Sequence, residues 1–318
     1  MRIVVMGAGA LGGYYGSFLQ RGGHDVLYVA RGEHLRAMQT KGLTIRTSDG
    51  DTTLTVNATD RAADAGRADL VFLATKAYSN PEAIEAIRPL VGPTCPVLSI
   101  QNGVEAVHDL AKAFGPQQVL PGTAVIGCGI LEPGLISGPV KPGKITTGEM
   151  DGSASERTAA IRGVFTDAGI AMDVRPDVVT FLWQKQLTVG PRSVLVALGR
   201  TSVGYFAQAP DALPMYEELM REYMAVAAAE GAHLEESQLQ AQIKSASGGT
   251  AGPVGGPGQM PSLQRDAENR RWLEVDEMIG SVVRLGAAQG VPTPVARVLT
   301  TLLRLQDVTN RDRMAQAK

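Results

Sequence analysis

Short apolar runs rich in β-branched residues recur through the first half of the chain, and helical patterns lie between them. Four such runs are typical of buried parallel strands: residues 3–6, 26–30, 69–74 and 97–100. The stretch 10–19 carries Tyr14, Tyr15 and Phe18 at helical spacing, which predicts a helix directly after the first strand. This alternation predicts an α/β fold with a Rossmann-type, doubly wound sheet.

Two segments of the first half depart from that alternation. Residues 42–56 alternate in period two around Asp49-Gly50, which predicts a β-hairpin inserted into the fold. Residues 119–140 carry a single charge, but their three prolines and five glycines exclude a membrane-spanning helix. We expect strands and turns near the cofactor there.

Near residue 176 long helical patterns replace the strands. They cover residues 178–199, 211–232, 262–290 and 293–308, and Gly190 and Pro191 are expected to interrupt the first of them. Residues 245–262 are too rich in glycine and proline for regular structure. They fit a mobile lid or a surface linker equally well. We therefore expect a dinucleotide-binding domain over residues 1–175 and a helical substrate domain over residues 176–318.

Composition narrows the class of partner. The 318 residues include 30 basic and 32 acidic side chains, mixed along the chain, so nothing indicates binding to nucleic acid or an anionic membrane. A small molecule is the better expectation. The two cysteines, Cys95 and Cys128, support neither a disulfide framework nor a metal site, and no secretory signal is evident. A cytoplasmic protein is expected.

The loop after the first strand has the pattern of a dinucleotide site. Gly7, Gly9 and Gly12 fit GxGxxG between a strand and a helix. The first glycine allows the turn, the second lets the backbone approach a pyrophosphate, and the third lets helix and strand pack closely. We expect the cofactor to contact the whole loop: Gly7, Ala8, Gly9, Ala10, Leu11 and Gly12. The competing interpretation is a glycine-rich turn without a ligand.

The end of the second strand bears on the choice of cofactor. Arg31 follows that strand, and an arginine there accommodates the 2′-phosphate of NADP. Glu33, two residues on, would instead bind the ribose hydroxyls of NAD. Both could also be simple surface charges. The strand-end rule favours NADPH.

Two further polar residues follow buried strands. Lys76 comes after the run 69–74, and Asn102 comes after 97–100. Ligands bind at the carboxyl edge of such sheets, so Lys76 could meet a carboxylate or phosphate and Asn102 the nicotinamide or a substrate. A solvated lysine and an Asn-Gly turn residue are the alternatives.

The order of motifs resembles the ketopantoate reductase (2-dehydropantoate 2-reductase) family almost from end to end. The matching segments are GAGALGGYYG at 7–16, TKAY at 75–78, QNGV at 101–104, WQK at 183–185, and PSLQRD with LEVDEMIG within 261–280. The resemblance implies an NADPH-binding Rossmann domain, a helical domain that closes over it, and reduction of 2-dehydropantoate to pantoate. A homodimer is possible, and the resemblance does not decide the oligomeric state.

The same resemblance assigns roles to individual residues. It makes Lys185 the acid that protonates the ketone, Glu274 the family glutamate, and Ser262 and Asp266 substrate residues. Lys76 and Asn102 match its two residues at the Rossmann edge, and Cys128 stands where a small residue contacts the cofactor.

The chemistry of ketone reduction agrees with these roles, because hydride addition leaves an alkoxide that needs a proton and positive charge nearby. The ordinary pKa of lysine is too high for this, so burial or a second cation must lower it. Without the resemblance, Lys185 and Glu274 could equally form an ion pair between helices.

One departure concerns the substrate. Family members usually carry asparagines four and eight residues after the lysine, and this chain has Val189 and Ser193. Reduction of another 2-oxo acid is therefore the second hypothesis. A non-catalytic dinucleotide sensor is the third, and the presence of Lys185, Glu274 and Ser262 together argues against it.

Overall fold

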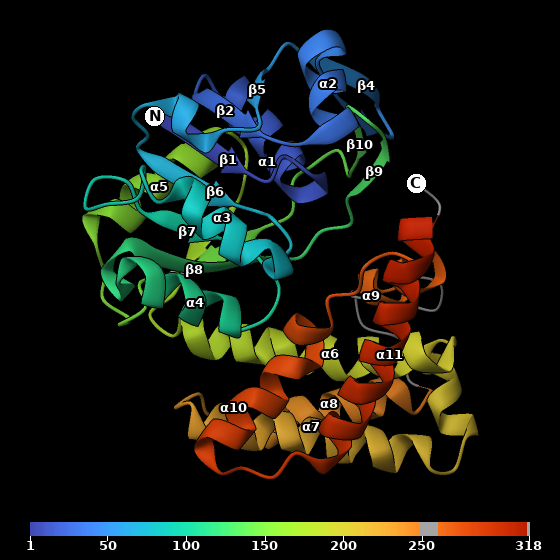
Figure 1. Cartoon of the computed structure of the whole chain (residues 1–318). Helices are drawn as coiled ribbons and strands as arrows, with labels where there is room; N and C mark the ends of the chain where they lie inside the picture. The colour runs from blue at the N-terminus through green and yellow to red at the C-terminus, as the bar shows by residue number, and fades with distance from the viewer. Residues whose placement is uncertain (249–259, 317–318) are drawn as a thin grey trace. The chain divides into compact units, whose positions relative to one another are not determined.

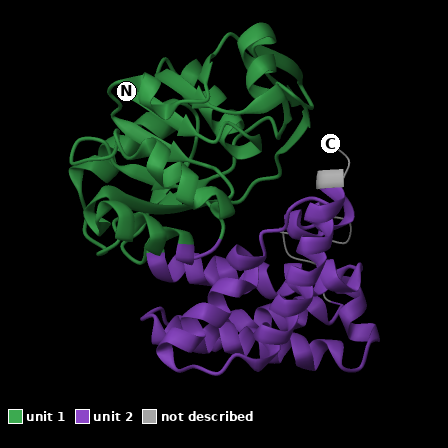
Figure 2. Ribbon diagram, in the orientation of Figure 1, with its two compact units in different colours: residues 1–102, 106–178 green, residues 103–105, 179–318 purple. Residues whose placement is uncertain are grey.

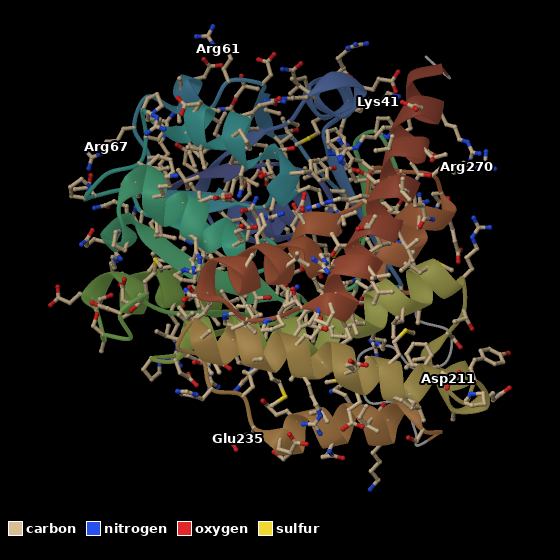
Figure 3. All side chains as sticks on the ribbon, turned by 60° about the horizontal axis from the view of Figure 1, so that its bottom comes forward. Lys41, Arg61, Arg67, Asp211, Glu235 and Arg270 are labelled. Atoms are coloured by element: carbon tan, nitrogen blue, oxygen red, sulfur yellow. The ribbon has the colours of Figure 1, made fainter. Side chains whose placement is uncertain are left out.

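The structure is a computed structural model that describes residues 1–248 and 260–316. The chain forms two compact units, residues 1–102 with 106–178 and residues 103–105 with 179–318 (Figure 2). The first unit is built on sheets and the second on helices (Figure 1). Charged side chains such as Lys41, Arg61 and Glu235 point away from the ribbon (Figure 3).

An eight-stranded sheet runs through the first unit in the order β12-β11-β8-β7-β6-β1-β2-β5. Its neighbouring strands are parallel except β8 and β11. The strands are β1 (Arg2–Met6), β2 (Asp25–Val29), β5 (Asn57–Thr59), β6 (Leu70–Leu73), β7 (Val97–Ser99), β8 (Val119–Ala124), β11 (Ile145–Thr147) and β12 (Met172–Val174). The four predicted strands are all present.

The strand order reverses at β1, since β2 lies on one side of it and β6 on the other. This is the strand order of a doubly wound sheet, and the similarity to solved structures confirms the predicted Rossmann-type fold. The helices of this unit are α1 (Ala10–Arg21), α2 (Gly32–Lys41), α3 (Asn80–Ile87), α4 (Glu105–Phe114, which starts in the second unit) and α5 (Glu156–Asp167). Short 3₁₀ helices occupy Ala62–Ala65, Ala77–Ser79 and Pro116–Gln118.

A second sheet of four strands has the order β4-β3-β10-β9. The predicted hairpin supplies β3 (Leu43–Thr47) and β4 (Gly50–Leu54), while β9 (Gly129–Glu132) and β10 (Leu135–Ser137) come from residues 119–140. Helix α1 contacts strands of both sheets. The hydroxyl groups of Tyr14 and Tyr15 donate to the carbonyl oxygens of Pro139 (2.6 Å) and Gly143 (3.0 Å), which fixes α1 to the segment that follows β10.

The second unit is helical, as predicted. Its helices are α6 (Val178–Gly199), α7 (Ala212–Ala229), α8 (Glu236–Ala246), α9 (Ser262–Glu268), α10 (Ser281–Gln289) and α11 (Pro294–Gln316), with a 3₁₀ helix at Val203–Gln208. Helix α7 contacts α8, α10 and α11 and forms the centre of the unit. The sequence patterns did not reveal α8, in which only Leu239 and Ala246 are buried.

The expected interruption of α6 at Gly190 and Pro191 is wrong, because the helix runs on to Gly199. Proline removes one backbone hydrogen bond. The next turn, residues 194–197, is buried on all sides. Burial of that turn stabilises the helix beyond the proline, as tertiary packing commonly outweighs local preference.

The expectation of one helix over residues 262–290 is also wrong. The chain leaves α9 at Glu268, and a π-helical turn at Asp276–Gly280 then leads into α10. Between them the Leu273 amide donates to Asp307 Oδ1 (2.7 Å), and Asn310 donates to the Arg271 carbonyl (2.9 Å). Asp307 and Asn310 lie on α11, so the backbone groups of Leu273 and Arg271 bond side chains from far along the chain and not other residues of a helix.

The glycine- and proline-rich segment, residues 245–262, is expected to lack regular structure, but this is wrong at its ends, because α8 runs to Ala246 and α9 begins at Ser262. Its residues 249–259, on which the lid expectation rests, lie outside the described residues.

Candidate active site

The loop from β1 to α1 needs glycine for two structural reasons. Gly7 has a φ of +93°, and a Cβ on Gly12 would lie 2.1 Å from the Gly7 carbonyl oxygen. The amides of Gly7 and Ala8 both donate to the Val29 carbonyl at the end of β2 (3.2 and 2.8 Å). The loop is therefore held in one conformation.

Gly9 is different, because nothing in its surroundings excludes a side chain. A Cβ there would have its nearest neighbour, Ile130 Cδ1, 4.0 Å away. Gly9 precedes the first turn of α1, which has no acidic residue and no side-chain cap. The backbone amides of that turn can hold an anion, and a side chain at Gly9 would fill the space where it sits. The loop fits the pyrophosphate of a dinucleotide.

His34, on α2, joins this loop to the turn between β9 and β10. Its Nδ1 accepts a hydrogen bond from the Gly134 amide (3.1 Å), so the proton is on Nε2, which donates to the Ala8 carbonyl (2.9 Å). Burial lowers the pKa of His34, although its bond to Ala8 opposes this. A neutral imidazole is the form that makes both bonds. The sequence analysis did not single out His34.

Arg31, expected at the cofactor phosphate, lies immediately before α2 and is largely exposed. Its guanidinium lies 2.6 Å from Glu82 Oε2 on α3. Glu33 is in the first turn of α2 and is also exposed. An anion that binds Arg31 must therefore compete with Glu82.

Lys76 and Asn102 follow β6 and β7 at the same edge of the sheet and are half-buried. Between them Gln101 donates from its amide to the Thr75 carbonyl (3.0 Å) and to Asn80 Oδ1 (2.6 Å), and it accepts from Ser99 (3.1 Å). This network fixes the backbone on which Lys76 and Asn102 stand. Gln101 was not predicted as a site residue, although it lies inside the QNGV motif.

Cys128 follows β8 and is half-buried. Burial raises the pKa of its thiol to about 12, so the group is a neutral thiol at physiological pH and not a nucleophile.

In the second unit Lys185 lies on α6, and Glu274 lies two residues before the π-helical turn. Burial lowers the pKa of Lys185 to about 8, while the charge of Glu274 opposes that shift. Glu274 is only 3% exposed. A lysine with this pKa is mostly protonated at neutral pH and can still release its proton, which suits a general acid.

Gln186 joins α6 to the π-helical turn at Asp276–Gly280. Its buried side-chain amide donates to the carbonyl oxygens of Glu277 (2.7 Å) and Met278 (2.9 Å) in the π-helical turn. The hydroxyl group of Tyr223 on α7 also donates to Met278. The residue after Lys185 is thus bonded to the turn after Glu274. Only the resemblance, through WQK, points to this position in the sequence.

Ser262 is the first residue of α9, and Asp266 lies one turn on, 3.7 Å from Arg271. Gln264, between them, donates to the Thr201 carbonyl beyond α6 (3.2 Å). Val189 and Ser193, where the family usually has asparagines, lie on α6 and offer one hydroxyl between them.

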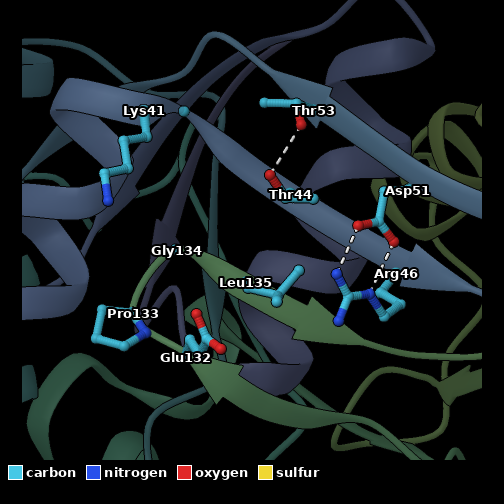
Figure 4. Close-up of a pocket in the computed structure, with 10 residues that line it drawn as sticks. Lys41, Thr44, Arg46, Asp51, Thr53, Glu132, Pro133, Gly134 and Leu135 are labelled. Atoms are coloured by element: carbon cyan, nitrogen blue, oxygen red, sulfur yellow. Dashed lines mark hydrogen bonds and ion pairs between the residues drawn. The ribbon is translucent and has the colours of Figure 1, made fainter.

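A separate hollow of about 300 Å³ opens on the four-stranded sheet (Figure 4). Its lining includes Lys41, the paired Arg46 and Asp51, and Glu132. None of the predicted site residues lines it. Among the described residues no cluster of His, Cys, Asp and Glu could hold a metal ion. Nor do the described helices include one that is both long and apolar enough to cross a membrane.

Family models match most of the chain. The model for ketopantoate reductase PanE/ApbA matches residues 3–152, and the model for its C terminal matches residues 177–307. The chain is 30% identical to the 2-dehydropantoate 2-reductase of Mesorhizobium japonicum, over 96% of this chain and 97% of that protein.

Solved structures of similar proteins share the fold of this chain. The PanE/ApbA family ketopantoate reductase of Ralstonia eutropha JMP134 has a TM-score of 0.86 at 29% identity and covers 98% of this chain and 100% of its own. D-mandelate dehydrogenase with NADH and anilino(oxo)acetate has the same TM-score and coverage at 21% identity, which shows the fold alone.

Proposed function

The chain belongs to the ketopantoate reductase PanE/ApbA family, and on that premise we propose that it reduces the ketone of a 2-oxo acid with NADPH, 2-dehydropantoate being the first candidate. The lowered pKa of Lys185, about 8, beside buried Glu274 is the observation that carries this proposal. It puts a proton donor of suitable strength in the helical unit.

In this proposal the first unit binds the dinucleotide. The α1 amides and Gly9 hold its pyrophosphate, Arg31 takes the 2′-phosphate, and Lys76, Asn102 and Cys128 border the nicotinamide end. When bound, NADPH supplies the hydride. The neutral state of His34 and the Gln101 network keep both parts of this surface in place.

In this proposal the second unit binds the substrate and supplies the proton. Lys185 donates a hydrogen bond to the ketone oxygen and gives up its proton as negative charge develops there. Glu274 orients the ammonium group or the new hydroxyl, and Ser262 and Asp266 contact the rest of the substrate. Water then returns a proton to the amine.

A second candidate substrate is favoured by Val189 and Ser193. Without two amide side chains the site has fewer hydrogen bonds for the hydroxyl of 2-dehydropantoate, and a site that lacks such partners discriminates less in its favour. Reduction of a different 2-oxo acid uses the same acid and cofactor. A non-catalytic sensor is less well supported, because it needs no proton donor and the lowered pKa of Lys185 suits one.

The test is NADPH oxidation by the purified protein with 2-dehydropantoate and a panel of other 2-oxo acids. Turnover with at least one of them supports the proposal, and the substrate with the highest kcat/KM names the reaction. Tight NADPH binding without turnover of any 2-oxo acid would contradict it and favour the sensor.

A further inference from the structure

Arg192 is a buried cation for which the described residues of the helical unit provide no counter-charge. It lies on α6, and only 9% of its surface is exposed. Within residues 1–248 and 260–316 its guanidinium group makes no hydrogen bond and no ion pair. An arginine stays protonated in proteins, so its burial costs free energy unless an anion compensates the charge.

The position of Arg192 relates it to Lys185. The two residues are seven apart on a continuous helix, which places them on the same face about 10 Å apart along the axis. Long side chains on a helix lean toward its N-terminus, and for Arg192 that direction is toward Lys185. The guanidinium therefore extends along the face that carries the proposed acid.

Tyr216 is a second buried donor, close enough to Arg192 for that charge to act on its hydroxyl group. It lies on α7, is 1% exposed and packs its ring against Phe206 with 5.5 Å between the centroids. Burial raises the pKa of Tyr216 to about 12, and the nearby charge of Arg192 opposes the shift. The hydroxyl thus keeps its proton at neutral pH. It too makes no hydrogen bond within the described part of the chain.

A guanidinium and a phenol together are suited to a carboxylate, which accepts from both. The carboxylate of a 2-oxo acid is bonded directly to the ketone carbon, so it stays beside Lys185 when the ketone oxygen accepts from that lysine. Lys185 leans toward the N-terminus of α6 as Arg192 does, so their charged ends stay about two turns apart, and a group further along the substrate is better placed to meet Arg192. The group that fits at Arg192 is a second acid at the far end of the substrate.

We propose that Arg192 and Tyr216 form a subsite for the distal carboxylate of a 2-oxo dicarboxylic acid. This inference rests on the proposed 2-oxo acid reductase activity and names its substrate class. It favours the second candidate substrate, a different 2-oxo acid, over 2-dehydropantoate, whose far end is a neutral hydroxyl group.

The experiment compares 2-oxoadipate with 2-oxohexanoate, which have the same carbon chain and differ only in the distal carboxylate. For the wild type we expect kcat/KM to favour 2-oxoadipate by about 10- to 100-fold, the range for a hydrogen-bonded charge. Arg192→Met should abolish that preference and leave 2-oxohexanoate unchanged. Arg192→Lys should retain part of it, and Tyr216→Phe should reduce it by less than Arg192→Met.

Thermal unfolding establishes that each variant is folded, and Tyr216→Phe tests the subsite if Arg192→Met is not. Equal kcat/KM values for the two acids in the wild type would overturn the inference, and so would a preference that survives in folded Arg192→Met. Either result leaves the reductase activity standing if both acids are reduced.

If no 2-oxo acid is reduced, the proposed function fails and calorimetry decides the subsite by itself. The protein with NADP⁺ is titrated with each acid. Binding of 2-oxoadipate that is at least tenfold tighter than that of 2-oxohexanoate supports the subsite. Equal or absent binding overturns it.

Discussion

The side-chain amide nitrogen of Gln186 lies 2.9 Å from the carbonyl oxygen of Met278. This bond joins α6, next to the proposed acid, to the turn that follows Glu274. Gln186→Leu keeps the side chain's size but removes the donor from two buried carbonyls. We expect it to lower the free energy of unfolding by about 1–3 kcal/mol and kcat by about tenfold.

Gln240→Leu is the matched control, because Gln240 donates to Glu236 on the exposed surface of α8. Its free energy of unfolding should change by no more than about 0.5 kcal/mol. Denaturant unfolding and steady-state kinetics provide both values. An unchanged kcat in folded Gln186→Leu would separate this bond from catalysis.

The loop glycines should differ in what they contribute. Gly9→Ala meets no atom closer than 4.0 Å, so the fold should persist while NADPH binding weakens by at least tenfold. Gly12→Ala would clash with the Gly7 carbonyl and should lower the thermal midpoint. Fluorescence titration with NADPH and thermal melts measure the two effects. Unaltered NADPH affinity in Gly9→Ala would argue that no pyrophosphate binds there.

Cofactor preference should depend on the Arg31–Glu82 pair. Arg31→Ala should raise KM for NADPH and leave KM for NADH nearly unchanged. Glu82→Gln frees Arg31 from its competitor and should lower KM for NADPH by a few-fold, because an exposed ion pair contributes about 0.2–1 kcal/mol. The ratio of kcat/KM values for the two cofactors is the measurement. A wild type that uses both equally would refute the preference for NADPH.

The fold of the first unit was predictable because its signals are local. The strand, glycine turn and helix around Gly7–Gly12 follow one another in sequence, and Asp49-Gly50 specifies its own hairpin. The break within residues 262–290 was not predictable in this way. It depends on Asp307 and Asn310, which lie more than thirty residues further along the chain.

The same distinction holds for the candidate site. The family resemblance selected Lys185 and Glu274, which lie in one unit, where the charge of Glu274 acts on the pKa of Lys185. Gln186 and His34 act through partners 91 to 100 residues away, so periodicity could not reveal them. Arg192 was missed because its significance depends on its burial and on the lack of a counter-charge among the residues that the structure describes.

The rate of reduction should depend on pH through Lys185. Its ammonium form is the acid, and with a pKa of about 8 it loses its proton as pH rises through that value. We therefore expect kcat for ketone reduction to fall above about pH 8, while NADPH binding, measured in parallel, changes little. The charge of Glu274 raises this pKa, so Glu274→Gln should move the decline to lower pH. A kcat that rises with pH would contradict the assignment.

The central claim is that Lys185 is the general acid, and Lys185→Ala tests it most directly. With the best 2-oxo acid, kcat should fall by about 10²- to 10⁴-fold, the range for a lost acid. NADPH should bind within about twofold of the wild-type affinity, because the residues proposed to hold it are in the other unit. A folded Lys185→Ala variant that turns over at the wild-type rate would contradict the account and direct attention to Lys76.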